Sequence, residues 1–265
     1  MAEEPLIAVF VDFENLAIGV RDMKGQAEFE ITIVLKRLLE KGRIVSKRAY
    51  CDWTQYRNAM REFHEQGFEM IDIPRSKLSG KNSADIRMVV DAVDLCYSKG
   101  HIDSFALLTG DSDFSPLVSK LKENDKRVIG CGVKNSTSDL LISNCDEFIY
   151  YDDLVRVRKE SRPRPAAAKK KKSEGGAHVA KSDEEKRQEG LDRLEEIVSS
   201  LHLDYDPLWG SLIKQTIRRV YPGFNESYYG YRSFGDLLAD AQKEGIIDLE
   251  YDEERGNFKV QLREP

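Results

Sequence analysis

Aspartates directly follow two of the apolar runs in the sequence, and these side chains are the best suited to chemistry. Asp12 follows the run over residues 6–11, and Asp111 and Asp113 follow the run over residues 104–109. Asp85 lies in the first turn of a predicted helix over residues 82–98. Carboxylates that gather at one place repel each other unless some protonate or a cation lies among them. Oxygen ligands without His or Cys favour Mg²⁺ or Mn²⁺.

Two such ions could clamp a phosphodiester, one activating water and the other stabilising the leaving oxygen. The neutral side chain of Asn15 is suited to hold the attacking water or a phosphate oxygen. Three further residues are candidate phosphate or water contacts, although loop polarity explains them about equally well: Lys81, Ser112 and Ser138.

Each aspartate taken alone also has a structural explanation. Asp113 could cap a helix that begins at Phe114, and Asp85 suits the positive end of its own helix. The set is more informative than its members, because all four are expected at one edge of the same sheet. The four His residues show no partner pattern, so histidine catalysis is not expected.

The elements that must position these aspartates alternate between short apolar runs and amphipathic segments. Strands are predicted over residues 6–11, 44–51, 68–73, 104–109, 127–133 and 147–151, and helices over 28–41, 56–66, 82–98, 114–123 and 138–144. This rhythm predicts an α/β fold, a Rossmann-like parallel sheet with helices on both faces. Ligands bind such sheets at the carboxyl ends of the strands, where the aspartates fall.

The rest of the chain divides into two segments. Residues 156–187 combine Pro, Ala and a Lys run without apolar periodicity, which predicts a basic disordered linker between a first domain at 1–155 and a second at 188–265. The second domain has three predicted helices, around residues 191–201, 208–221 and 234–244. A hairpin of strands 246–251 and 257–262 follows. This order favours a small winged helix-turn-helix domain.

The net charge of −6 hides an uneven distribution. Residues 1–155 carry 20 basic and 26 acidic groups, residues 156–187 carry 12 and 5, and residues 188–265 carry 9 and 16. The acidic total argues against nucleic acid, whereas the basic segment could supply nonspecific phosphate contacts. No apolar run is long enough to span a membrane, and the N-terminus lacks the features of a secretory signal. The four scattered Cys residues are expected to be reduced thiols in a cytoplasmic protein.

Four strings of the first domain resemble the NYN domain, a LabA-like branch of the PIN nuclease fold. They are residues 9–15, residues 81–85 with Asp91, residues 107–114 and residues 145–149, and the T-G-D-S-D-F string at 109–114 is the most specific. The resemblance covers about residues 5–152 and implies a metal-dependent ribonuclease. It places the family's acidic ligands on Asp12, Asp85, Asp111 and Asp113, and its asparagine on Asn15. One departure is Ser83-Ala84, where relatives often carry Gly and a branched residue.

The C-terminal block resembles the OST-HTH (LOTUS) domain over about residues 188–263. The strings that carry the resemblance lie at residues 208–214, 221–224 and 229–238. It implies a winged helix that binds RNA or a protein partner. Because the block is acidic, RNA binding would need a local patch. The candidate residues for that patch are Lys214, Arg218, Arg219, Tyr229 and Arg232.

These observations predict a divalent-metal-dependent ribonuclease, expected to be an endonuclease, that acts on single-stranded or structured RNA. A protein partner at the C-terminal domain and a second copy of the chain are further candidate partners. The first alternative is an RNA-binding adaptor that keeps the fold without turnover. The second is a small-molecule phosphatase, although the first strand lacks the D-x-D of haloacid phosphatases and no glycine-rich phosphate loop is present. A toprim-type site would match Asp111 and Asp113 but needs a Glu where Asp12 lies.

Overall fold

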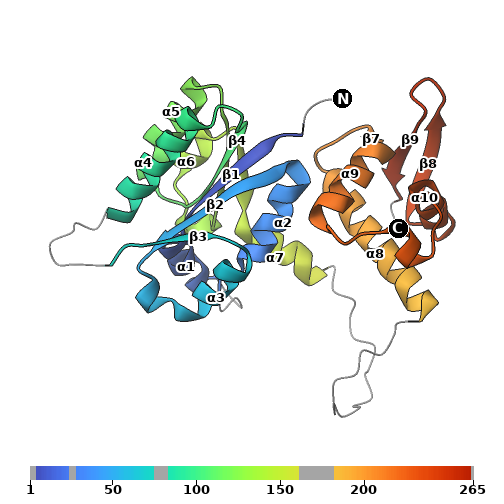
Figure 1. Cartoon of the computed structure of the whole chain (residues 1–265), viewed down its shortest axis with the longest axis horizontal. Helices are drawn as coiled ribbons and strands as arrows, with labels where there is room; N and C mark the ends of the chain where they lie inside the picture. The colour runs from blue at the N-terminus through green and yellow to red at the C-terminus, as the bar shows by residue number, and fades with distance from the viewer. Residues whose placement is uncertain (1–3, 24–27, 75–82, 161–181, 264–265) are drawn as a thin grey trace, which may run out of the picture. The chain divides into compact units, whose positions relative to one another are not determined.

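The computed structural model describes residues 4–23, 28–74, 83–160 and 182–263 (Figure 1). The chain divides into two compact units between residues 164 and 165. Lys81 and residues 161–181 of the predicted linker lie outside the described residues. No helix in the described ranges is long and apolar enough to cross a membrane.

The first unit is built around a six-stranded parallel sheet with the strand order β3-β2-β1-β4-β5-β6. Its strands are β1 (Leu6–Asp12), β2 (Arg43–Cys51), β3 (Glu69–Asp72), β4 (Ser104–Leu108), β5 (Arg127–Gly132) and β6 (Glu147–Tyr150). Its α-helices are α1 (Phe13–Arg21), α2 (Ile31–Lys41), α3 (Arg57–Glu65), α4 (Ser83–Ser98), α5 (Ser115–Glu123), α6 (Asp139–Asn144) and α7 (Tyr151–Glu160). Short 3₁₀ helices are η1 (Trp53–Gln55), η2 (Ser112–Phe114) and η3 (Lys134–Ser136).

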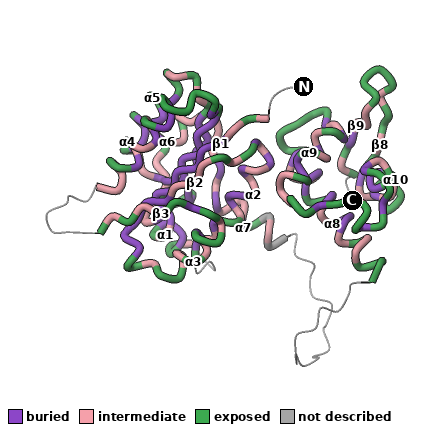
Figure 2. Tube along the Cα trace, in the orientation of Figure 1, coloured by how far each residue is buried: buried purple, intermediate pink, exposed green. Residues whose placement is uncertain are grey.

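The helices cover both faces of this sheet, as the sequence predicts. Alternate residues of the central strands point to opposite faces, so Val9 and Val11 of β1 join one core while Ala8 and Phe10 join the other. Helices α1, α2, α3 and α7 contribute to the first core, and α4, α5 and α6 to the second. Figure 2 shows the buried central strands between the two helical layers.

Two helices of the first unit were not predicted. Helix α1 begins at Phe13, directly after the last residue of β1, and Asp12 caps it. Helix α7 extends to Glu160, so residues 156–160 of the predicted linker are helical. The other end of that segment is also helical, because α8 begins at Asp183. The boundaries 156 and 187 for a disordered linker are therefore wrong at both ends.

The second unit is a small winged-helix arrangement with its own core. It consists of α8 (Asp183–Leu201), β7 (Leu208–Trp209), α9 (Gly210–Val220), η4 (Glu226–Tyr229), α10 (Phe234–Lys243), β8 (Ile247–Asp252) and β9 (Asn257–Leu262). The β8–β9 hairpin matches the prediction, and β7 adds a third antiparallel strand at the start of the predicted second helix. The fold class is thus an α/β sheet domain followed by a winged helix.

Candidate active site

The candidate site lies where the central strands β1 and β4 end. These strands pair in parallel up to Val11 and Leu108. Asp12 is the last residue of β1, and Asp111 follows β4 by three residues. The strand order runs outward from the β1–β4 pair in both directions, which is the switch point at which open α/β sheets bind ligands.

Asp12 is a buried carboxylate, with 7% of its surface exposed. Its Oδ1 accepts a hydrogen bond from the Asn15 N–H at 3.3 Å, which caps α1. Its Oδ2 accepts one from the Thr109 hydroxyl at 3.1 Å. Burial raises the pKa of Asp12 to about 7, and the charges of Asp85 and Asp111 add to the rise. The two hydrogen bonds lower the pKa but do not offset these effects.

Thr109 joins the two strand ends and is a residue that the sequence did not single out. Its side chain is fully buried. The hydroxyl donates to Asp12 and accepts a hydrogen bond from the Asp111 N–H at 3.2 Å. Asp111 in turn accepts the Asp113 N–H at 2.9 Å and caps η2. A single hydroxyl therefore fixes Asp12 relative to the loop that carries the next two aspartates.

Asp85 reaches the same edge from the first turn of α4. Burial raises its pKa, and the charges of Asp111 and Asp113 raise it further. Asp85 is also the largest charge acting on Asp12, so Asp85 is the carboxylate that interacts with each of the other three. The capping explanation for Asp113 is wrong for α5, because Phe114 precedes that helix and no side chain caps it.

A cation is the natural partner for such a cluster, and the donor chemistry supports one. Carboxylates forced together take up protons unless a cation neutralises them, and repulsion by Asp85 and Asp111 adds to the effect of burial on the pKa of Asp12. Among the described residues, however, no three acidic, His or Cys side chains form a group that could hold a metal ion. Mg²⁺ keeps several waters and usually binds one or two carboxylates directly. The residues fit a hydrated cation rather than a closed cage.

Asn15 has a more specific position than the sequence indicates. Its Oδ1 accepts a hydrogen bond from the Gly110 N–H at 2.8 Å, which ties α1 to the loop after β4. Gly110 has no room for a side chain, because a Cβ there would lie 2.5 Å from the Ser136 carbonyl oxygen. With its oxygen engaged, Asn15 has its Nδ2 donor left for a ligand.

The remaining candidates of the first unit differ in their surroundings. Ser138 caps α6, since its Oγ accepts the Leu140 N–H at 3.2 Å, which favours a structural role. Ser112 is half-buried in η2, between Asp111 and Asp113. Lys81 is not among the described residues.

In the second unit, the structure places Tyr229, a candidate for the RNA-binding patch, in the core. Its ring is 3% exposed and packs on Phe224 and against Gly190 of α8. The neighbouring Tyr228 is 51% exposed and could contact a partner.

The predicted basic patch is partly neutralised within the protein. Lys214 and Arg218 both face Glu226, at 3.6 and 2.9 Å. Arg219 donates to the Thr216 hydroxyl at 3.2 Å. Arg232 is exposed. The cationic side chains of α9 are thus shared with an acidic neighbour, which reduces their attraction for phosphate.

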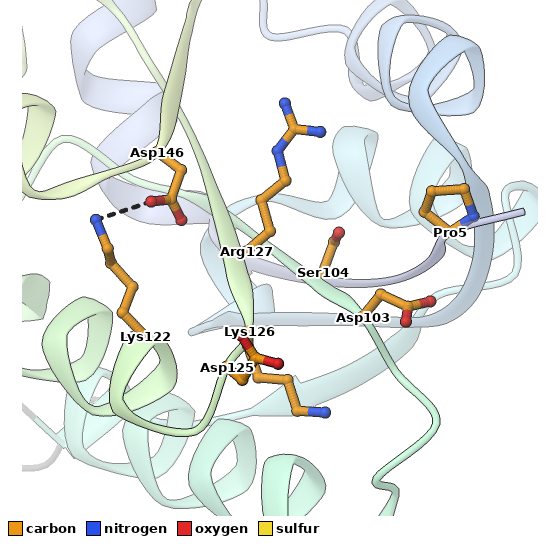
Figure 3. Close-up of a pocket in the computed structure, with 8 residues that line it drawn as sticks. All are labelled: Pro5, Asp103, Ser104, Lys122, Asp125, Lys126, Arg127 and Asp146. Carbon is orange, nitrogen blue, oxygen red and sulfur yellow. Dashed lines mark ion pairs between the residues drawn. The ribbon is translucent and has the colours of Figure 1, made fainter. Parts of the chain in front are cut away.

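A cavity of about 550 Å³ lies at the opposite, amino edge of the sheet (Figure 3). Its acidic side chains satisfy the first amides of strands: Asp103 accepts the Leu6 N–H at 2.7 Å, and Asp146 accepts the Val128 N–H at 2.8 Å. Asp146 also pairs with Lys122 at 2.8 Å. These are structural roles.

The four cysteines are free thiols. Burial raises the pKa of Cys51 and of Cys131 to about 12. They are therefore neutral near pH 7 and poor metal ligands or nucleophiles.

Comparisons with known proteins agree with this fold. The chain is 28% identical over 157 residues to the uncharacterized protein MJ0482 of Methanocaldococcus jannaschii, covering 59% of this chain and 60% of that one. It therefore spans less than two thirds of this relative. A crystal structure of VPA0982, a protein of unknown function from Vibrio parahaemolyticus, matches with a TM-score of 0.51 and 27% identity. That match covers 58% of this chain and 97% of the other.

The family assignment rests on a match to a family model. The model of the NYN domain, a PIN-like nuclease family, matches residues 6–152, which is the described sheet from β1 to β6 and includes all four aspartates. The match ends before the second unit. Through its first unit, the chain belongs to the NYN domain family.

Proposed function

We propose that the first unit is a divalent-metal-dependent ribonuclease that hydrolyses phosphodiester bonds of RNA. The observation that carries the proposal is the convergence of Asp12, Asp85, Asp111 and Asp113 on one sheet edge, where burial and mutual repulsion raise the pKa of Asp12 to about 7. Such a cluster destabilises a protein that has no use for it, and membership of a nuclease family supports the same conclusion.

The side chains divide the work according to their environments. Asp12, Asp85, Asp111 and Asp113 would hold Mg²⁺ or Mn²⁺, one or two of them directly and the others through water. The bound metal would lower the pKa of water and stabilise the leaving oxygen. Thr109 keeps Asp12 and Asp111 in register, so it is a positioning residue.

Asn15 acts as a hydrogen-bond donor in this proposal. Because its Oδ1 accepts a hydrogen bond from the Gly110 N–H, the amide is oriented, and its Nδ2 can donate to a phosphate oxygen. We therefore assign Asn15 to substrate orientation. Of the two roles that its residue type allows, phosphate binding is the better supported.

The second unit is proposed to be an OST-HTH domain that binds RNA or a protein. The winged-helix arrangement and the exposed Tyr228 support this, and the exposed Arg232 adds a cation beside it in sequence. Because Glu226 neutralises part of the α9 patch, this unit is expected to bind RNA weakly by charge alone.

Incubation of labelled single-stranded RNA with the full chain, with and without Mn²⁺, tests the ribonuclease proposal. We expect cleavage by the wild type that needs the metal, and loss of that cleavage in Asp111→Asn. Asp125→Asn is the matched control, because Asp125 is exposed beside the cavity at the amino edge. Its φ of 56° is one that Asn tolerates.

The same assay separates the ribonuclease from the adaptor. An adaptor would retain RNA on native gels without turnover under any divalent ion. Metal-dependent cleavage that persists unchanged in Asp111→Asn would instead show that another site or a contaminant is responsible.

A further inference from the structure

A cationic side chain lies beside the acidic cluster on the face of the sheet that α1 covers. Arg21 is the exposed last residue of α1, and its guanidinium carbon lies 5.8 Å from the centre of the Tyr56 ring. The Tyr56 ring meets Phe13 edge to face, with 5.1 Å between ring centres. Phe13 directly follows Asp12 and is buried in the core. Arg21 is therefore braced by an aromatic ring that the core holds next to the candidate site.

Arg21 has no acidic partner in the part of the chain that the structure describes. By contrast, Arg48 pairs with Glu69 at 2.8 Å and Arg87 pairs with Asp91 at 3.0 Å. A guanidinium that is held in place but not neutralised remains available to an anion from solution.

The pKa of the Tyr56 hydroxyl is shifted by both Asp12 and Arg21. Burial is the main cause that raises the pKa of Tyr56, and the Asp12 charge raises it further. Arg21 lowers it through its charge and through a hydrogen bond to the hydroxyl. Tyr56 is thus hydrogen-bonded to Arg21 and lies within electrostatic range of Asp12, which places it on the path from the acidic cluster to the cation.

The length of α1 sets the distance between Arg21 and Asp12. At about 1.5 Å per residue, the backbone of Arg21 lies about 13 Å from that of Asp12 along α1. Side chains on a helix extend back toward its N-terminus, so the guanidinium is nearer to the site than its backbone. The cation therefore lies toward the far end of the helix that Asp12 caps, and not among the carboxylates.

We propose that Arg21, held over Tyr56, binds a phosphate of the RNA strand next to the one that is cleaved. This inference rests on the proposed ribonuclease function and adds to it a direction for the substrate, from the acidic cluster across the start of α1 toward Tyr56. Such a contact strengthens RNA binding at a site that otherwise repels phosphate.

A structural role for Arg21 is the main alternative, since a basic residue in the last turn of a helix interacts favourably with its dipole. That role predicts an effect on stability and none on RNA binding. The matched control is Arg43, the exposed first residue of β2 at the amino edge of the same sheet. Arg43→Gln removes the same charge far from the candidate site.

The test measures binding of a short single-stranded RNA to the full chain in Ca²⁺ at several salt concentrations, with the RNA checked for integrity. We expect Arg21→Gln to weaken binding about tenfold, equivalent to about 1.4 kcal/mol. The slope of log K against log salt should become shallower by about 0.7, the value for one lost phosphate contact on a single strand. Arg43→Gln should match the wild type in both quantities.

Kinetics in Mn²⁺ give a second measure. For Arg21→Gln the change should fall on KM rather than kcat, because the contact lies outside the reacting phosphate. Tyr56→Leu removes the ring that Arg21 packs on, so it should raise KM by part of the amount seen for Arg21→Gln. Tyr56→Phe keeps the ring and should raise KM less than Tyr56→Leu does.

The outcomes separate the two proposals. If the wild type binds and cleaves RNA while Arg21→Gln and Arg43→Gln behave alike, the Arg21 contact is refuted and the ribonuclease stands. If the wild type binds RNA without cleaving it, the ribonuclease is refuted, and the difference in salt slope still decides the contact. Absence of RNA binding by the wild type overturns both.

Discussion

The buried carboxylate of Asp12 should make the metal-free protein less stable as the pH rises. Its pKa is about 7 in the folded protein, against 3.8 for an exposed aspartate. Between these values the folded state binds more protons than the unfolded state, so stability falls as the pH rises from about 4 to about 7 and then levels off. Asp12→Asn removes this dependence because an amide does not ionise in that range.

The size of the effect follows from the pKa difference. About three pKa units at 1.36 kcal/mol each amount to about 4 kcal/mol above pH 7. Asn has one carbonyl oxygen where Asp12 uses two, so the variant loses one hydrogen bond, which costs about 1 kcal/mol. Asp12→Asn should therefore be about 3 kcal/mol more stable than the wild type at pH 7.5 in EDTA. At pH 4 it should be about 1 kcal/mol less stable.

Tryptophan fluorescence can follow the first unit alone in the full chain. The sequence has two Trp residues, and Trp209→Phe leaves Trp53 as the reporter. Trp53 is 2% exposed and stacks on Phe13, with 5.3 Å between ring centres, next to Asp12. Urea titrations from pH 4 to 8, with EDTA and then with Mg²⁺, give the unfolding free energy. Mg²⁺ should stabilise the wild type more than Asp12→Asn.

Asp146→Asn is a control for which the opposite change in stability at neutral pH is expected. Burial alone raises the pKa of Asp146, but its hydrogen bonds with Lys122 and the Val128 N–H outweigh this and hold the pKa below its usual value. Its contribution is present above the unfolded pKa and is lost as the pH falls, so Asp146→Asn should destabilise the protein at neutral pH. A wild-type stability that does not fall between pH 4 and 7 in EDTA would refute the reasoning for Asp12, as would an Asp12→Asn protein that is less stable at every pH.

Three further outcomes are expected. Thr109→Val should destabilise the first unit by about 1–3 kcal/mol, because buried polar groups of Asp12 and the following loop lose their partner, and it should lower RNA cleavage; wild-type values in urea titrations and cleavage assays would contradict this. Tyr229→Ala should destabilise the second unit by about 3–5 kcal/mol, measured by Trp209 fluorescence, and a loss of RNA binding without destabilisation would restore the stacking role. Glu226→Gln should release the two cations of α9 and strengthen RNA binding several-fold in low salt; unchanged affinity would place the RNA elsewhere.

The sheet and the four aspartates were predictable because local rules place both. Short apolar runs bounded by polar residues locate strands such as β1 and β4, and the ends of parallel strands meet at one edge. Helix α1 was predictable in principle, since Phe13, Leu16 and Val20 are buried at helical spacing. Its first turn also contains Asn15 and follows Asp12, and these residue types indicate ligands rather than the start of a helix.

Other features depend on contacts that are remote in sequence. Thr109 ends an apolar run and looks like a core residue, and only its hydrogen bonds to both strand ends show its role. Tyr228 and Tyr229 are adjacent and chemically identical, and the packing of Gly190 from α8 decides which one is buried. The ends of the predicted linker are rich in charge, and Arg156 of α7 and Asp183 and Glu184 of α8 are exposed side chains of regular helices.

Aspartates stabilise the fold at the amino edge of the sheet and destabilise it at the carboxyl edge, and this difference matters for engineering the protein. At the amino edge, Asp103 and Asp146 complete the hydrogen bonding of strand starts. At the carboxyl edge, burial and neighbouring carboxylates raise the pKa of Asp12 and of Asp85, so their charged forms are disfavoured there. Selection for heat resistance alone would therefore erode the carboxyl edge first, since neutral substitutions there raise stability at the expense of activity. A more stable variant should be sought by strengthening the amino edge, where stability can increase without altering the candidate site.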